Sequence, residues 1–156
     1  MTEPGPPSAS ADVHIAAAPE VVYSLITDLD EMAKLAAETT TMTWHKTDGA
    51  RPGAVFRGEN RNGSRTWTTT CVVTDATPGE VFAFDVTSMA VVPVAHWRYE
   101  IVPADGGCRV IESTWDRRPN WFRKVAGVAT GVNDRQTENT KHIELTLMRL
   151  KARAER

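Results

Sequence analysis

Cysteine and long hydrophobic runs are scarce in this 156-residue chain, and each scarcity argues against a class of protein. The two cysteines, Cys71 and Cys108, lie far apart and form no CxxC pair, which argues against a disulfide-rich secreted domain. We expect both to be small core residues of a cytoplasmic protein. No apolar run is long enough to span a bilayer, and residues 1–10 hold three prolines but no basic and apolar leader. We therefore expect neither an integral membrane segment nor a signal peptide.

An excess of charge of one sign is missing as well. The chain has 18 Lys and Arg against 20 Asp and Glu residues, mixed along its length. It lacks the basic footprint of nucleic-acid binding, so we expect no nucleic-acid partner. Phosphate-cradling glycine loops, dinucleotide fingerprints and nucleophile elbows are absent, and we expect no cofactor. The histidines are too scattered for a metal site, and we expect no metal; they are His14, His45, His96 and His142.

The length suits one domain with a single core. We place this domain at residues 11–152, between a flexible, Pro-rich tail over residues 1–10 and a frayed C-terminus over residues 153–156. The sequence is compatible with a monomer or a homodimer.

The order of elements can be read from periodicity. Residues 11–17 alternate apolar and polar side chains, which predicts a first strand. Pro19 favours a helix running to about Thr27, and Asp28 or Asp30 can cap a second short helix. From Thr39 onward, short β-prone runs separated by turn signals predict an antiparallel meander. Its six strands are Thr40–Lys46, Ala54–Arg61, Arg65–Asp75, Val81–Thr87, Val94–Pro103 and Arg109–Asp116.

The meander is followed by a long helix over Gly131–Leu150, around which we expect the rest of the chain to be organised. Its C-terminal half carries a hydrophobic stripe, whereas its N-terminal half has an amide-rich face. This face consists of Asn133, Gln136, Asn139 and Thr140. Either a cavity lies beneath the polar half, or the first turns fray into solvent.

Alternation along the strands predicts which side chains face inward. Trp97 and Tyr99 share one face of their strand, and Trp67, Phe82 and Phe84 lie on the apolar faces of theirs. In the last strand Glu112 shares its face with Val110, so an inward Val110 carries Glu112 inward with it. The alternative is that Ile111 and Trp115 are the buried set and that Glu112 is solvated.

Several stretches resemble the START-like (SRPBCC) superfamily, and within it the bacterial polyketide cyclase/dehydrase and lipid transport family. They are VHIAAAPEVVYSLITDLD, GARPGAVFRGENRNG with RTWTTT following, VAHWRYEIVP with DGGCRVIES, and the terminal helix. The likeness covers roughly Asp12 to Lys151. These motifs mark turns, strands and the cavity wall in the family, so they specify a fold rather than a reaction.

The resemblance implies an α+β helix-grip fold. In this fold a curved seven-stranded antiparallel sheet wraps around the long C-terminal helix, two short helices follow the first strand, and a cavity holds a small hydrophobic or amphipathic ligand. The residue pattern supplies an apolar wall with a few polar groups, which is typical of such a cavity. The candidate ligand-binding residues are Trp67, Phe82, Phe84, Trp97, Tyr99, Glu112, Asn133, Gln136 and Thr140. The aromatic residues among them are equally compatible with ordinary core packing.

Three functions from different classes follow. The first is binding or transport of a lipid or polyketide-like ligand. The second is a polyketide cyclase, aromatase or dehydratase with Glu112 as general acid or base and Tyr99 as hydrogen-bond donor, provided that burial raises the pKa of Glu112. In a purely structural role, Glu112 would instead pair with Arg57 or Arg98. The third is a protein-interaction module using Leu145 and the apolar linker 117–130, which could otherwise be a lid or a short helix.

Overall fold

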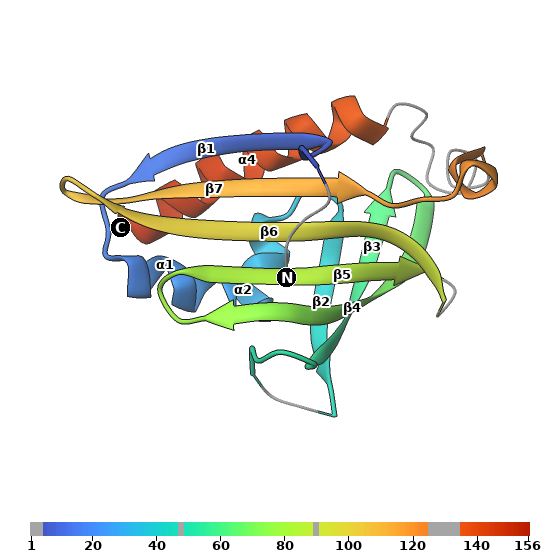
Figure 1. Ribbon diagram of the computed structural model, residues 1–156, viewed down its shortest axis with the longest axis horizontal. Coiled ribbons are helices and arrows are strands. Elements are labelled where there is room, and N and C mark those ends of the chain that lie inside the picture. The colour runs from blue at the N-terminus through green and yellow to red at the C-terminus, as the bar shows by residue number, and fades with distance from the viewer. Residues whose placement is uncertain (1–4, 47–48, 89–90, 125–134) are drawn as a thin grey trace.

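The computed structural model of the protein describes residues 5–46, 49–88, 91–124 and 135–156. Among these residues lie seven strands and the three helices α1, α2 and α4, and residues 120–124 form a further short helical segment (Figure 1). The strands are β1 (Ala9–Ile15), β2 (Thr39–His45), β3 (Val55–Asn62), β4 (Arg65–Thr77), β5 (Val81–Ser88), β6 (Val92–Ala104) and β7 (Gly107–Asp116). The helices are α1 (Pro19–Ile26), α2 (Leu29–Leu35) and α4 (Arg135–Ala154).

The strands form one antiparallel sheet in the order β1-β7-β6-β5-β4-β3-β2. Tight hairpins join β3 to β4, β4 to β5 and β6 to β7, as the turn signals predict. At Asn62-Gly63 the β3–β4 turn needs a positive φ, and Gly63 has a φ of 63°. At the β6–β7 hairpin, a Cβ on Gly107 would lie 2.0 Å from the carbonyl oxygen of Ile15, so only glycine fits against the end of β1.

The three helices lie on one side of the curved sheet (Figure 1). Helix α4 packs mainly against β1 and α2 mainly against β2, the two edge strands, so the helices bridge the ends of the sheet. This is the predicted helix-grip architecture, with α+β class and two short helices after the first strand. Its consequence is a space between the concave sheet face, α2 and α4.

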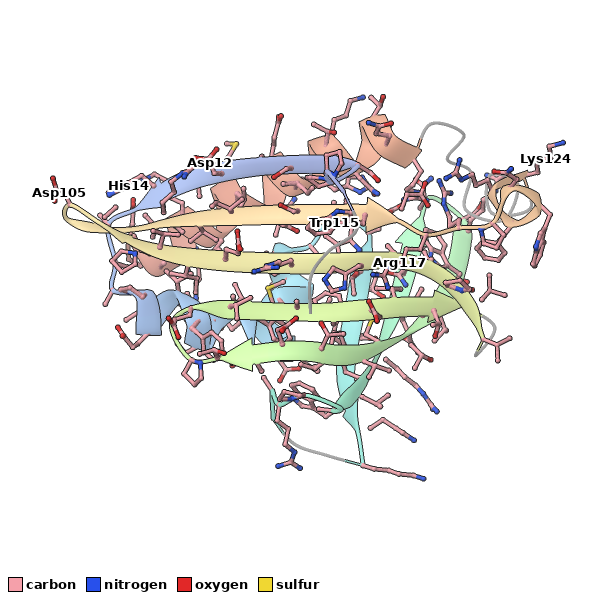
Figure 2. All side chains as sticks on the ribbon, viewed as in Figure 1. Asp12, His14, Asp105, Trp115, Arg117 and Lys124 are labelled. Carbon is pink, nitrogen blue, oxygen red and sulfur yellow. The ribbon has the colours of Figure 1, made fainter. Side chains whose placement is uncertain are left out.

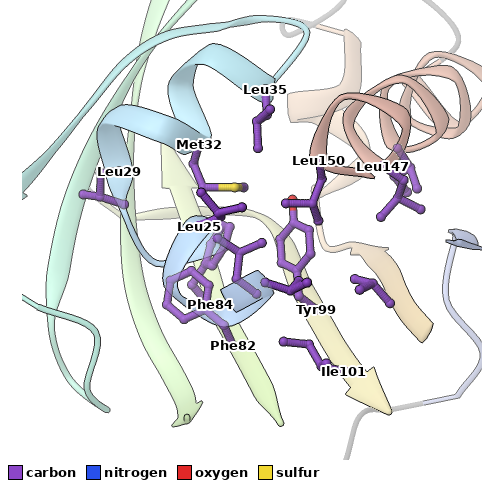
Figure 3. Packing of buried hydrophobic residues seen from close by; sticks show 14 of the residues in the cluster. Leu25, Leu29, Met32, Leu35, Phe82, Phe84, Tyr99, Ile101, Leu147 and Leu150 are labelled. Atoms are coloured by element: carbon purple, nitrogen blue, oxygen red, sulfur yellow. The ribbon is translucent and has the colours of Figure 1, made fainter. Parts of the chain in front are cut away.

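The two short helices begin where the sequence signals indicate. Pro19 stands at the start of α1, and the Asp28 side chain accepts hydrogen bonds from the backbone N–H groups of Asp30 and Glu31 at the start of α2. Both helices bury apolar side chains. Leu25, Leu29 and Met32 join the core that α4 closes from the other side with Leu147 and Leu150 (Figure 3).

The N-terminal end of the domain differs from the expectation. The sequence predicts a flexible tail over residues 1–10, but β1 begins at Ala9, two residues earlier than the predicted first strand. The Ser8 backbone N–H donates to the Thr114 carbonyl at 2.8 Å, and the Trp115 indole donates to the Gly5 carbonyl at 3.1 Å. Pairing with β7 thus orders this segment despite its prolines. At the other end, α4 continues to Ala154.

The convex face of the sheet carries a polar cluster around one buried histidine. His96 is fully buried although it lies opposite Trp97 and Tyr99 in the alternation of β6. Its Nδ1 lies 2.7 Å from an Asp85 carboxylate oxygen, which also accepts a hydrogen bond from Arg117 at 2.9 Å. Figure 2 labels Arg117 and Trp115 on this outer face. Strand alternation alone does not reveal that the side chains of Arg117 and Trp115 cover His96.

Candidate functional site

A cavity of about 350 Å³ lies between the concave face of the sheet, α2 and α4. This volume is within the range of roughly 300–1,000 Å³ that is usual for small-molecule sites. The sheet contributes side chains from β2 through β7, and the helices contribute one residue of α2 and several of α4.

The sheet side of the cavity is mainly apolar. Phe56 and Phe84 meet edge to face with ring centroids 5.1 Å apart, and Trp67, Trp97 and Met42 extend the wall. The aromatic and thioether side chains supply a large, polarisable surface for contact with a ligand. A ligand with an extended apolar face would be complementary to this wall.

One acidic group lies within this wall. Glu112 on β7 and Tyr99 on β6 are register partners, so both side chains point to the concave face. Each is 3% exposed, and the Tyr99 hydroxyl donates to Glu112 Oε2 at 2.7 Å. The other carboxyl oxygen, Glu112 Oε1, is buried and has no hydrogen-bond partner among the described residues. The partner of Glu112 is thus neither Arg57 nor Arg98; Arg98 pairs with Glu100 instead.

Burial governs the protonation of this pair. Loss of hydration raises the pKa of Glu112 from its ordinary value of 4.5 to about 8, against the lowering effect of the hydrogen bond from Tyr99. Burial, followed by the charge and the hydrogen bond of Glu112, raises the pKa of Tyr99 well above its usual value. At neutral pH most of the Glu112 side chains carry a proton. The cavity wall therefore presents a neutral carboxylic acid that can donate a hydrogen bond.

Two ion pairs lie in other parts of the cavity wall, away from Glu112. Arg118 holds Asp116 through hydrogen bonds of 3.0 Å and 2.9 Å. Burial acts to raise the pKa of Asp116, but the hydrogen bonds and charge of Arg118, together with the charge of Arg123, outweigh it and keep the pKa below its ordinary value. The second pair joins Arg135 at the start of α4 to Glu38 before β2, at 2.6 Å. Each guanidinium that lines the cavity is therefore paired with a carboxylate.

A cysteine also lines the cavity. Burial raises the pKa of the Cys71 thiol to about 12, opposed by a hydrogen bond with Thr69. The thiol stays protonated near neutral pH and is a poor nucleophile. Among the described residues, no three His, Cys, Asp or Glu side chains gather so that they could hold a metal ion.

Some of the residues singled out in the sequence lie together in the cavity wall. These are Trp67, Phe84, Trp97, Tyr99 and Glu112. Three others lie elsewhere. Phe82 is packed in the core at 1% exposure, the exposed Gln136 donates to the Ser8 carbonyl at 2.8 Å, and Thr140 donates to the Gln136 carbonyl at 3.0 Å. Asn133 falls outside the described residues.

The polar side chains that α4 turns toward the cavity are Arg135, Asn139, His142 and Thr146, of which only Asn139 belongs to the predicted amide-rich face. Their line is displaced by roughly 70° around the helix from the apolar stripe centred on Ile143. The reason is that α4 packs on β1 and, to a smaller extent, on β7, so the apolar stripe faces these two strands. The polar line, on the adjacent side of the helix, faces the cavity. The spacing of four, three and four residues was visible in the sequence. What the sequence lacks is the docking direction of the helix.

The linker after β7 contributes to the same wall. Residues 120–124 are helical, and Phe122 is buried against Val92 while it lines the cavity. The neighbouring Trp121 is 57% exposed. Residues 125–130 of the predicted lid or short helix lie outside the described residues.

The sheet, the helices and the cavity between them define a START-like protein of the helix-grip type. A family profile described as polyketide cyclase/dehydrase and lipid transport matches residues 6–155. The chain belongs to this family. Among the described residues, no helix is both apolar and long enough to pass through a bilayer.

Comparisons with solved structures agree on the fold. Protein CV1439 from Chromobacterium violaceum is similar over 97% of this chain and 99% of its own, with a TM-score of 0.70 and 15% identity. The polyketide cyclase-like protein Cgl2372 from Corynebacterium glutamicum is similar over 91% and 87%, with a TM-score of 0.61 and 24% identity. The di-domain aromatase/cyclase StfQ of steffimycin biosynthesis is matched over 94% of this chain and 49% of its own, with a TM-score of 0.70 and 14% identity. No curated protein matches in sequence.

Proposed function

We propose that the protein binds a small, mostly apolar ligand in the cavity and holds a carbonyl or hydroxyl group of that ligand at Glu112. The observation that carries the proposal is the buried Glu112 Oε1, which lines the cavity without a partner while Oε2 is held by Tyr99. A buried polar atom without a partner costs free energy, and a ligand group at hydrogen-bond distance would remove that cost. The apolar wall and the cavity volume support the same function.

A second candidate is catalysis by the same group. A carboxylic acid with a pKa of about 8 at a cavity wall is poised to give or take a proton near neutral pH, which is what a cyclisation or dehydration requires. The family description, polyketide cyclase/dehydrase and lipid transport, includes both cyclisation and dehydration. The third candidate, an interaction module, receives less support because an open cavity is not needed for it.

Native mass spectrometry of the protein purified from its own host tests the leading proposal. We expect a bound small molecule that organic extraction releases for identification. Ala95→Phe, which places a ring in the cavity, should abolish this binding, whereas Ala104→Phe on the exposed end of the β6–β7 hairpin should preserve it. An empty wild-type protein that co-purifies with a second chain would contradict the proposal and favour the interaction module.

Glu112→Gln separates a carrier from an enzyme. Glutamine keeps the shape of the side chain but has no acidic proton to transfer. A carrier variant should still hold the wild-type ligand, with at most a weakened affinity. An enzyme variant should accumulate a different molecule, the unconverted substrate, in place of the product found with the wild-type protein.

A further inference from the structure

The cavity has a second polar region, formed by side chains from two elements far apart in sequence. Glu38, just before β2, accepts a hydrogen bond from Arg135 at 2.6 Å through Oε1. His142 Nδ1 lies 3.6 Å from the same oxygen, and Asn139 lies between Arg135 and His142 on the cavity face of α4. All four side chains line the cavity.

Two hydrogen-bonding groups in this region have no partner among the described residues. Glu38 Oε2 is buried and accepts no hydrogen bond. The Asn139 side chain makes none either, although the residue is only 8% exposed. Another cavity amide differs in this respect, because Asn60 accepts from Thr39 at 2.9 Å and donates to Thr69 at 3.2 Å. Among the described residues, the cavity thus has unpartnered groups at two places, at Glu112 Oε1 and in the Glu38 region, and not at every polar side chain of its wall.

The charges of the region select the kind of group that would fit. Arg135 already holds Glu38, and the other cavity arginine, Arg118, already holds Asp116. A ligand carboxylate would have to displace one of these carboxylates or lie beside an unpaired oxygen of like charge. A ligand N–H or O–H group meets no such conflict, because Glu38 Oε2 can accept from it.

We propose that Glu38 and Asn139 form a second binding subsite for a neutral hydrogen-bond donor, a hydroxyl or an amine, on the ligand that the cavity holds. This inference rests on the proposed function and specifies the ligand class. The ligand has an apolar face against the aromatic wall, one polar group at Glu112 and a donor at Glu38. A ligand whose polar end is a carboxylate, such as a simple fatty acid, is disfavoured.

Three anthracene probes of nearly equal size test the subsite at pH 7. They are 1-aminoanthracene, a neutral donor, 1-methylanthracene, which cannot donate, and 1-anthracenecarboxylate, an anion. Fluorescence titration should show that the wild-type protein binds the amine about tenfold more tightly than the methyl compound, because only the amine can donate a hydrogen bond to the charged Glu38 carboxylate. The anion should bind most weakly.

Glu38→Gln should bring the affinities for the amine and methyl probes within about threefold of each other and strengthen binding of the anion about tenfold, because Arg135 loses the carboxylate that neutralises it. Asn139→Leu should reduce the preference for the amine without strengthening binding of the anion. Glu59→Gln removes an exposed carboxylate on β3 that does not line the cavity, and its affinities should match the wild type.

The outcomes separate the two proposals. Saturable binding with equal affinity for the amine and methyl probes, unchanged in Glu38→Gln, would refute the subsite and leave the binding function standing. Failure of all three probes to bind, or binding that Ala95→Phe does not affect, would refute the cavity as a binding site and the subsite with it.

Discussion

Replacing the buried acid with its amide, Glu112→Gln, should remove a large part of the pH dependence of stability. In the folded protein Glu112 is 3% exposed and its pKa is raised from 4.5 to about 8, mainly by burial. The unfolded chain hydrates this carboxyl and returns its pKa to the ordinary value. The folded state thus binds the proton more tightly than the unfolded state at every pH between the two values.

The sign and size of the effect follow from this difference. When the folded state binds more protons, the free energy of unfolding falls as the pH rises. The contribution of Glu112 is fully present below about pH 4.5, decreases through neutral pH and is lost above about pH 8. With about 1.36 kcal/mol for each pKa unit, the total change is on the order of 5 kcal/mol. That is a large fraction of the 5–15 kcal/mol, roughly, by which a typical domain is stable.

The assay is urea unfolding, followed by circular dichroism, of the wild-type and Glu112→Gln proteins at several pH values from 4.5 to 9. The free energy of unfolding of the wild type, relative to that of the variant, should fall by several kcal/mol across this range. Glu59→Gln serves as the control because it makes the same chemical substitution at an exposed side chain outside the cavity. A difference between wild type and Glu112→Gln that is constant with pH would refute the reasoning, since it would mean that Glu112 ionises alike in both states.

Three further substitutions should have separable effects in the same assay. Tyr99→Phe removes the 2.7 Å hydrogen bond that lowers the pKa of Glu112, so it should cost about 1–2 kcal/mol and move the pH-dependent loss of stability to higher pH; a loss at the wild-type pH would contradict this role. Gly107→Ala should cost about 3 kcal/mol or more, because its Cβ would overlap the Ile15 carbonyl; an unchanged unfolding midpoint would show that β1 can move aside. Arg149→Met should cost about 1 kcal/mol, because the guanidinium donates to two carbonyls at the C-terminal end of α2 at 3.2 Å; no change at all would show that water replaces it.

Local sequence patterns predict the elements of the fold well. Alternation groups Tyr99 with Trp97 on the inward face, and Asn62-Gly63 marks the hairpin observed between β3 and β4. For Glu112 alternation leaves two orientations open, and the pairing of β7 with β6 selects the inward one. Such patterns act within one strand or one turn, where steric constraints and burial on one side decide the conformation. The segment over residues 5–10 is a case where composition misleads, since pairing with β7 orders it.

The candidate site was predictable only in part. Strand alternation places Trp97 and Tyr99 on the face that lines the cavity, whereas helical periodicity selects Gln136 and Thr140, which do not line it. A helical wheel shows which residues share a face, but it does not show where a cavity lies beside that face. No sequence signal pointed to Glu38, which is in a loop.

By itself, then, the sequence determined the order of the elements, the inward faces of most strands and the resemblance to a START-like family. Only the tertiary structure decided which flank of α4 meets the cavity and that Glu38 faces Arg135 across 97 positions of the chain. It also decided that Tyr99 is the partner of Glu112. The physical reason is that periodicity reports local geometry, whereas these contacts depend on how a helix docks on edge strands and on how much water that docking removes from each carboxyl group.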